Sequence, residues 1–131
     1  MAILTGTASW TDKTLIACGR FYPPEAKSAE ARLRHYASVF PTVEVDSSYY
    51  AMPSATNAAL WVERTPQDFV FDVKAFRLFT GHQTNVDVLH QDIQAALGAT
   101  SKQLYYKDVP QEVREELWRR FKQALWPFKT A

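Results

Sequence analysis

The chain has 131 residues, of which 47% are hydrophobic and 14% aromatic, so it contains enough apolar material for the core of one domain. Fifteen basic and fourteen acidic side chains leave a formal net charge of +1, which argues against a basic nucleic-acid-binding domain. Cys18 is the only cysteine, so an internal disulfide and a metal site built from thiolates are both excluded.

The sequence shows no targeting or membrane-spanning pattern. Residues 1–6 contain no basic leader, and no apolar segment follows that resembles a signal peptide. No window reaches the roughly 20 apolar residues that a transmembrane helix requires. The single cysteine fits a reducing compartment. We therefore expect a soluble, cytoplasmic protein without a membrane partner.

In the first half of the chain, short β-type runs alternate with helical patterns. Residues 2–9 are small or β-branched and predict a strand, followed by a loop. Apolar residues at helical spacing predict a helix over 28–40, with Ser28 as its N-cap. A second strand is expected at 42–46, and a second helix at about 55–64.

The second half continues this alternation. Residues 69–74 are aromatic and β-branched and predict a third strand, which a polar stretch over 75–85 follows. Helices are expected at about 86–97, ending before Gly98, and at about 111–124, with Pro110 in the first turn. About three strands and four helices in this order indicate an α/β fold with a parallel sheet.

Side chains alternate between the two faces of a strand, which divides the second and third strands into apolar and charged sides. Val43 and Val45 share one face of the second strand, and Phe71 and Val73 share the corresponding face of the third. We expect these apolar residues to contact the helices. The opposite face then carries Glu44, Asp46, Asp72 and Lys74.

Five short motifs follow one another along the chain: GTASW at 6–10, FYP at 21–23, VEVDSSYY at 43–50 with Pro53, Trp61 before Thr65 and Pro66, and FVFDVK at 69–74. In this order they resemble the YecE-like family, also called domain of unknown function 72, and the resemblance covers the whole chain. The resemblance implies a parallel β/α barrel of the TIM type. The Gly-rich turn and fourth strand of the family do not follow. Residues 1–131 are therefore expected to be the N-terminal portion of one barrel domain, a half barrel truncated before its fourth strand.

The charged face supplies the candidate catalytic residues. Asp46 and Lys74 lie at the carboxyl ends of their strands, the end at which β/α barrels place active sites. Together with Glu44 they form a cluster in which a buried lysine would have a shifted pKa suited to acid–base chemistry. His82 follows the third strand and is a further candidate base. Alternatively, the charges form a salt-bridge network that only sets strand register.

The loops after the three strands supply candidate binding residues. Aromatic side chains there can stack on a planar base or a sugar ring, or else pack on one another as a lid. The predicted substrate-binding residues are Trp10, Tyr22, Ser47, Tyr49, Tyr50 and Thr80.

No cofactor is indicated by the sequence. The Walker A and G-x-G-x-x-G patterns are absent. Glu44, Asp46 and His82 are a set that could bind a divalent metal, but their spacing matches no known metal signature, and we predict no metal site.

Three functions remain open from the sequence. The first is an enzyme that acts on a small polar, sugar-like or phosphorylated substrate, with Lys74 and Glu44 in proton transfer and Asp46 as electrostatic partner. The second is a binding module without catalysis, for a nucleotide or single-stranded nucleic acid; the near-neutral charge argues against tight nucleic-acid binding. The third is an inactive fragment that associates with a second half barrel through its open sheet edges.

Overall fold

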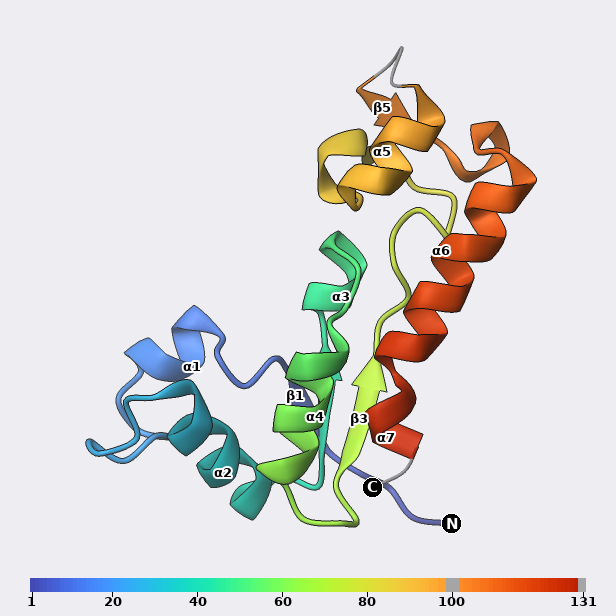
Figure 1. Ribbon diagram of the computed structural model, residues 1–131. Coiled ribbons are helices and arrows are strands. Elements are labelled where there is room, and N and C mark those ends of the chain that lie inside the picture. Colours follow the sequence, from blue (N-terminus) through green and yellow to red (C-terminus); the bar gives the residue numbers. More distant parts are fainter. Residues whose placement is uncertain (99–101, 130–131) are drawn as a thin grey trace.

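The computed structural model describes residues 1–98 and 102–129 and contains a parallel sheet with the order β1-β2-β3 (Figure 1). The strands are β1 (Gly6–Ala8), β2 (Thr42–Val45) and β3 (Val70–Val73). The predicted α/β class is therefore confirmed. The helices are α1 (Lys13–Ala17), α2 (Ala29–Val39), α3 (Ser47–Tyr50), α4 (Ala55–Glu63), α5 (Gln91–Leu97), α6 (Gln111–Ala124) and α7 (Trp126–Lys129).

The first two strands are held in register by a close backbone contact and by one tyrosine. Gly6 pairs with Thr42, and a Cβ atom at position 6 would lie 2.1 Å from the Thr42 carbonyl oxygen, so no side chain fits there. The buried Tyr36 hydroxyl accepts a hydrogen bond from the Thr7 backbone N–H at 2.7 Å and donates one to the Thr42 carbonyl at 3.0 Å. Helix α2 is thereby joined to both strands.

The apolar face of the sheet packs against α2 and α4, as the alternation predicts. Val43 and Val45 are only 1% and 3% exposed, and they form one core with Trp10, Leu33 and Tyr36. Glu44, Asp46, Asp72 and Lys74 are all partly or fully exposed on the other side. The expected division between an apolar face and a charged face is therefore present.

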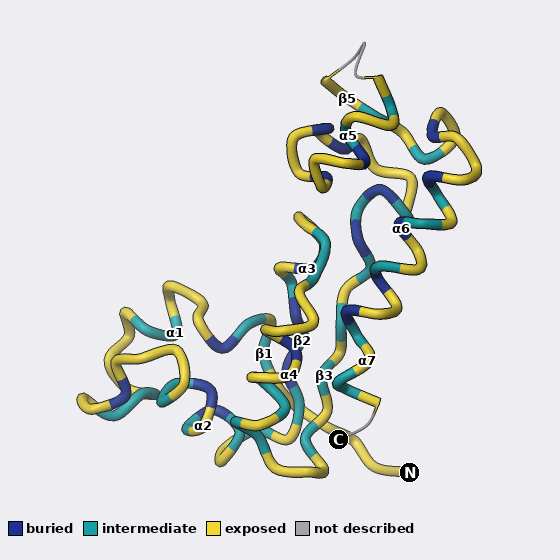
Figure 2. Tube along the Cα trace, in the orientation of Figure 1, coloured by how far each residue is buried: buried dark blue, intermediate teal, exposed yellow. Residues whose placement is uncertain are grey.

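A second core lies between α5, α6 and the segment after β3. Phe76 and Leu78 are both 0% exposed and contact a set of apolar residues from the later helices: Leu89, Ile93, Val109, Val113, Leu117 and Phe121. The prediction that 75–85 is merely a polar stretch was wrong. Backbone hydrogen bonds from Phe79 to Phe76 and from Gly81 to Leu78 form tight turns. The trace of the segment after β3 is accordingly coloured as buried over part of its length (Figure 2).

Three of the predicted helices are confirmed as α2, α4 and α6. Ser28 and Ser54 cap α2 and α4, each accepting a backbone N–H with its hydroxyl oxygen. Pro110 is the residue before the first turn of α6 rather than within it. Its fixed φ and missing N–H suit the start of a helix.

The predicted helix over 86–97 is shorter than expected. Residues Val86–Val88 form a single 3₁₀ turn, and the chain is extended at Leu89 before α5 begins at Gln91. The Asn85 side chain accepts the Asp87 N–H and so stabilises this separate turn. The expected end of the helix is confirmed, because Gly98 adopts the left-handed conformation with φ 58°.

Short elements within the predicted loops were missed, and the first strand is shorter than its pattern. β1 includes only Gly6–Ala8 of the expected 2–9. Helices α1 and α3 occupy parts of the loops after β1 and β2, and α7 follows α6. The strands β4 (Thr84–Asn85) and β5 (Gln103–Leu104) pair antiparallel, which the parallel pattern did not predict.

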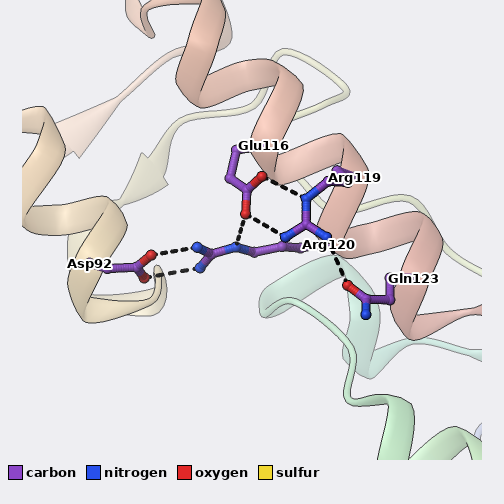
Figure 3. A network of polar contacts seen from close by, with 5 residues as sticks. All are labelled: Asp92, Glu116, Arg119, Arg120 and Gln123. Atoms are coloured by element: carbon purple, nitrogen blue, oxygen red, sulfur yellow. Dashed lines mark hydrogen bonds and ion pairs between the residues drawn. The ribbon is translucent and has the colours of Figure 1, made fainter.

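An ion-pair network connects α5 to α6 (Figure 3). The Arg120 guanidinium donates to both carboxylate oxygens of Asp92 on α5, one of them at 2.9 Å, and to Glu116 at 2.7 Å. Arg119 also donates to Glu116, at 2.7 Å, and to Gln123 at 3.0 Å. Hydrogen bonds from Arg120 lower the pKa of Asp92 to about 2, and those from Arg119 and then Arg120 lower that of Glu116 to about 2.

The network predicts a dependence of stability on pH. A carboxylate with a lowered folded-state pKa stabilises the fold above its ordinary pKa, here 3.8 and 4.5, and loses that contribution as the pH falls towards about 2. We expect R120A to be less stable than the parent at pH 7 and the difference to shrink below pH 4. Urea denaturation at several pH values measures this. R34A, which removes an exposed pair within α2, is the control; a difference for R120A that did not change with pH would contradict the prediction.

Candidate functional site

An open cleft of about 420 Å³ lies at the carboxyl ends of β1 and β2. Ser9 and Trp10 follow β1, and the residues from Glu44 to Ser47 form the end of β2 and the start of α3. The remaining wall comes from the connection between α3 and α4 and from α4 itself, through Ala51, Met52, Pro53, Ser54, Asn57 and Trp61. Helix α3 therefore turns the chain around the mouth of this cleft.

Two carboxylates, Glu44 in β2 and Asp46 directly after it, converge on one lysine that follows β3. The Lys74 ammonium lies 3.1 Å from Asp46 Oδ1 and 3.6 Å from Glu44 Oε1. Parallel pairing causes this meeting, because Val45 is opposite Val73 and the Lys74 N–H donates to the Val45 carbonyl. Asp72 lies opposite Glu44 in the register, but none of the ion pairs seen in the described residues joins it to Lys74.

The charges of the cluster follow from this geometry. The hydrogen bond from Lys74 lowers the pKa of Asp46, and the same bond raises the pKa of Lys74. The prediction of a buried lysine was wrong, because the Lys74 side chain is 48% exposed. No element within the described residues covers this end of the sheet deeply enough to desolvate it. Lys74 therefore remains an ammonium at neutral pH and suits charge stabilisation rather than proton abstraction.

Tyr49 lies at the centre of a second group, beside the carboxylates. Its ring centroid is 5.4 Å from the Lys74 Nζ and 5.5 Å from the Arg77 Cζ, and the His82 ring lies at 5.7 Å. Thr80 is hydrogen-bonded to His82 Nδ1 at 2.7 Å. Tyr50 contacts Tyr49 edge-on and is 61% exposed. The structure therefore brings Tyr49, Thr80 and His82 together on the side of Lys74.

His82 contacts Tyr49 and Thr80, whereas Glu44 and Asp46 contact Lys74. In residues 1–98 and 102–129, no three His, Cys, Asp or Glu side chains gather in a way that could hold a metal ion. The alternative metal set of Glu44, Asp46 and His82 is therefore not assembled here.

Trp10 lines the cleft, whereas Tyr22 supports it from behind. Trp10 packs edge-on against Trp61, with ring centroids 5.1 Å apart. The Tyr22 hydroxyl donates to the Trp10 carbonyl, and its ring packs against Phe21 and His35. Burial raises the pKa of Tyr22 to about 12. Tyr22 thus positions the loop and does not line the cleft.

The first comparison with known proteins decides the family. A family model described as "Protein of unknown function DUF72" matches residues 4–131. The chain belongs to the DUF72 family. The UPF0759 protein YunF of Bacillus subtilis (strain 168) is 33% identical over 126 residues, which are 96% of this chain and 35% of YunF.

A solved structure of a DUF72 family protein from Enterococcus faecalis V583 is also similar, with a TM-score of 0.47 and 23% identity. It covers 75% of this chain, which in turn spans 30% of that protein. This DUF72 chain thus spans about a third of the length of these two relatives. Each helix in the described part of the chain is too short or too polar to cross a membrane.

Sequence reasoning missed three residues around the DUF72 cleft. Asn57 and Trp61 line it from α4, and Arg77 lies over Tyr49. Trp61 had been noted only as part of a motif, although a helix that follows a strand-end loop often faces the same site. Arg77 lies in the segment interpreted as a polar stretch, and its position depends on the turn that buries its neighbours Phe76 and Leu78.

The site combines three chemical properties. The carboxylates and hydroxyls of Asp46, Glu44 and Ser47 can accept or donate hydrogen bonds, and Trp10 with Trp61 gives an apolar wall. Lys74 neutralises part of the acidic charge. Such a surface can hold a small polar molecule that has one apolar face.

Proposed function

We propose that the cleft binds a small polyhydroxylated ligand, such as a sugar, at the strand ends of a β/α barrel of the TIM type. The observation that supports this most directly is the Asp46–Lys74–Glu44 cluster at the carboxyl ends of β2 and β3, beside a cleft walled by Trp10. Carboxylates accept hydrogen bonds from hydroxyl groups, and an indole wall packs on the apolar face of a sugar ring.

In the enzymatic form of this proposal, the three charged residues have different roles. Lys74 holds Asp46 ionised and orients the ligand. Glu44 lies farther from the ammonium, at 3.6 Å against 3.1 Å, so it is the carboxylate freer to exchange a proton with a bound hydroxyl. Binding without turnover would instead identify a non-catalytic module.

Titrating the chain with ribose, glucose and inositol, followed by NMR, tests the proposal. We expect K74M to weaken binding about tenfold or more, because two carboxylates lose their shared counter-ion and repel each other. K74R keeps the charge and should retain most of the affinity. Thermal melts of both variants should match the parent, because the pair is solvent-exposed.

Two results would overturn this proposal. Absence of binding to all three compounds would remove the ligand class. A large loss of stability in K74M with binding retained would show that the cluster is a salt-bridge network that sets strand register.

A further inference from the structure

Arg77 is a cation without a carboxylate partner. Among the described residues, its side chain makes no ion pair and no hydrogen bond, and its Nε is shielded from solvent. Arg34, Arg64, Arg119 and Arg120 pair with carboxylates, whereas Arg32 and Arg114 share with Arg77 a buried Nε that has no hydrogen-bond partner. Desolvating part of an unpaired guanidinium costs free energy, which an anion bound to that guanidinium would offset.

The position of Arg77 is fixed by backbone contacts on both sides. Its N–H donates to the Tyr49 carbonyl at 3.0 Å, and its own carbonyl accepts the His82 N–H at 3.1 Å. The Thr80 hydroxyl donates to the same carbonyl at 3.1 Å. These bonds hold the segment after β3 against α3, so the guanidinium over the Tyr49 ring is attached to an ordered part of the backbone.

Other hydrogen-bond donors surround the same ring. Lys74 and Arg77 both lie over Tyr49, and the His82 ring forms a T-shaped contact with it. Lys74 forms ion pairs with Asp46 and Glu44, whereas Arg77 forms none among the described residues. The charge over Tyr49 is therefore balanced on the Lys74 side and unbalanced on the Arg77 side.

We propose that Arg77, with Lys74 and His82 around the Tyr49 ring, forms a subsite for a phosphomonoester beside the cleft, so that the natural ligand is a phosphorylated sugar or polyol that reaches from the cleft past Lys74 to Arg77. A guanidinium binds two phosphate oxygens through its planar fork, and the imidazole and ammonium are further donors to the remaining oxygen. This inference rests on the proposed function, because Lys74 links the subsite to the carboxylates that would hold the hydroxyl groups.

Arg114 provides a matched control for Arg77. Its guanidinium lies 5.2 Å from the Tyr106 ring centroid, and its Nε is likewise buried and unpartnered. Arg114 is on α6, however, and of the residues described only this one cation lies over that ring. R77A therefore removes a stacked arginine whose ring is also contacted by Lys74 and His82. R114A removes a stacked arginine that is the one cation over its ring among the described residues.

The experiment compares ribose 5-phosphate, ribose and inorganic phosphate in calorimetric titrations of the parent, R77A, R77K and R114A. We expect the parent to bind ribose 5-phosphate at least tenfold more tightly than ribose. R77A should abolish that difference, R77K should retain only part of it, and R114A should leave it unchanged. Circular dichroism identifies any variant that fails to fold, and R77K then serves in place of R77A.

Equal affinities for ribose and ribose 5-phosphate in the parent, or equal losses in R77A and R114A, would overturn the subsite. A different result would show that the proposed sugar cleft is wrong but the phosphate subsite is right. In that case ribose would not bind, while inorganic phosphate would bind to the parent and not to R77A.

Discussion

Replacing Phe76 by alanine should lower the free energy of unfolding by about 3–5 kcal/mol, the usual cost of removing a buried aromatic side chain. Phe76 is fully buried at the centre of the second core, where it contacts Phe79 edge-on with ring centroids 5.6 Å apart. Residues from the segment after β3, α5 and α6 meet around it. Its loss would leave a cavity among these elements, and the cost of that cavity adds to the cost of the lost burial.

Urea denaturation followed by circular dichroism and tryptophan fluorescence measures this effect. Y105A is the control, since that aromatic side chain is exposed and its removal should cost less than about 0.5 kcal/mol. A loss below about 1 kcal/mol for F76A would show that the second core contributes little to the cooperative unit.

A second large effect is expected in the association state of the chain. In the described residues, the sheet has the order β1-β2-β3, so each outer strand has one edge without a strand partner. Exposed apolar side chains lie near both edges, with Ile3 and Leu4 before β1 and Val70 in β3. Unpaired edges with such neighbours favour strand addition from a second molecule. We expect sedimentation velocity to show a mass that rises with protein concentration towards that of a dimer.

Lysine substitutions test the sheet edge as the cause of association. V70K places a charge on the edge strand and should shift the protein to monomer. V88K makes the same change at another exposed valine, in the 3₁₀ turn Val86–Val88 outside the parallel sheet, and should leave association unchanged. A single monomeric species for the parent at all concentrations, with a cooperative melt, would contradict the prediction.

The regular elements could be predicted because their signals are local. The helical spacing of Leu33 and Tyr36, the caps Ser28 and Ser54, and the alternation in β2 depend only on near neighbours in the chain. The segment after β3 could not be predicted in this way. Phe76 and Leu78 are two residues apart in a stretch without period, and their burial depends on α5 and α6, which follow much later.

The candidate site was predicted in part for the same reason. The meeting of Asp46 with Lys74 follows from strand alternation and parallel register. Exposure of Lys74 depends instead on what covers the open face of the sheet, which no local pattern encodes. Arg77 escaped notice because its role depends on an aromatic ring 28 residues earlier, a distance in sequence that no motif spans.

The glycine that opens the GTASW motif illustrates how geometry can limit mutation without any role in a ligand site. Position 6 lies three residues before Ser9, which lines the cleft together with Trp10, so a fixed glycine there could be taken for a functional residue. Its constraint comes from the Thr42 carbonyl, which leaves no room for a Cβ atom. Any of the other amino acids would push β1 away from β2 and break the Tyr36 bridge. Variation at this position is therefore restricted by strand pairing, whereas variation at Trp10 or Asp46 would test the ligand site proposed above.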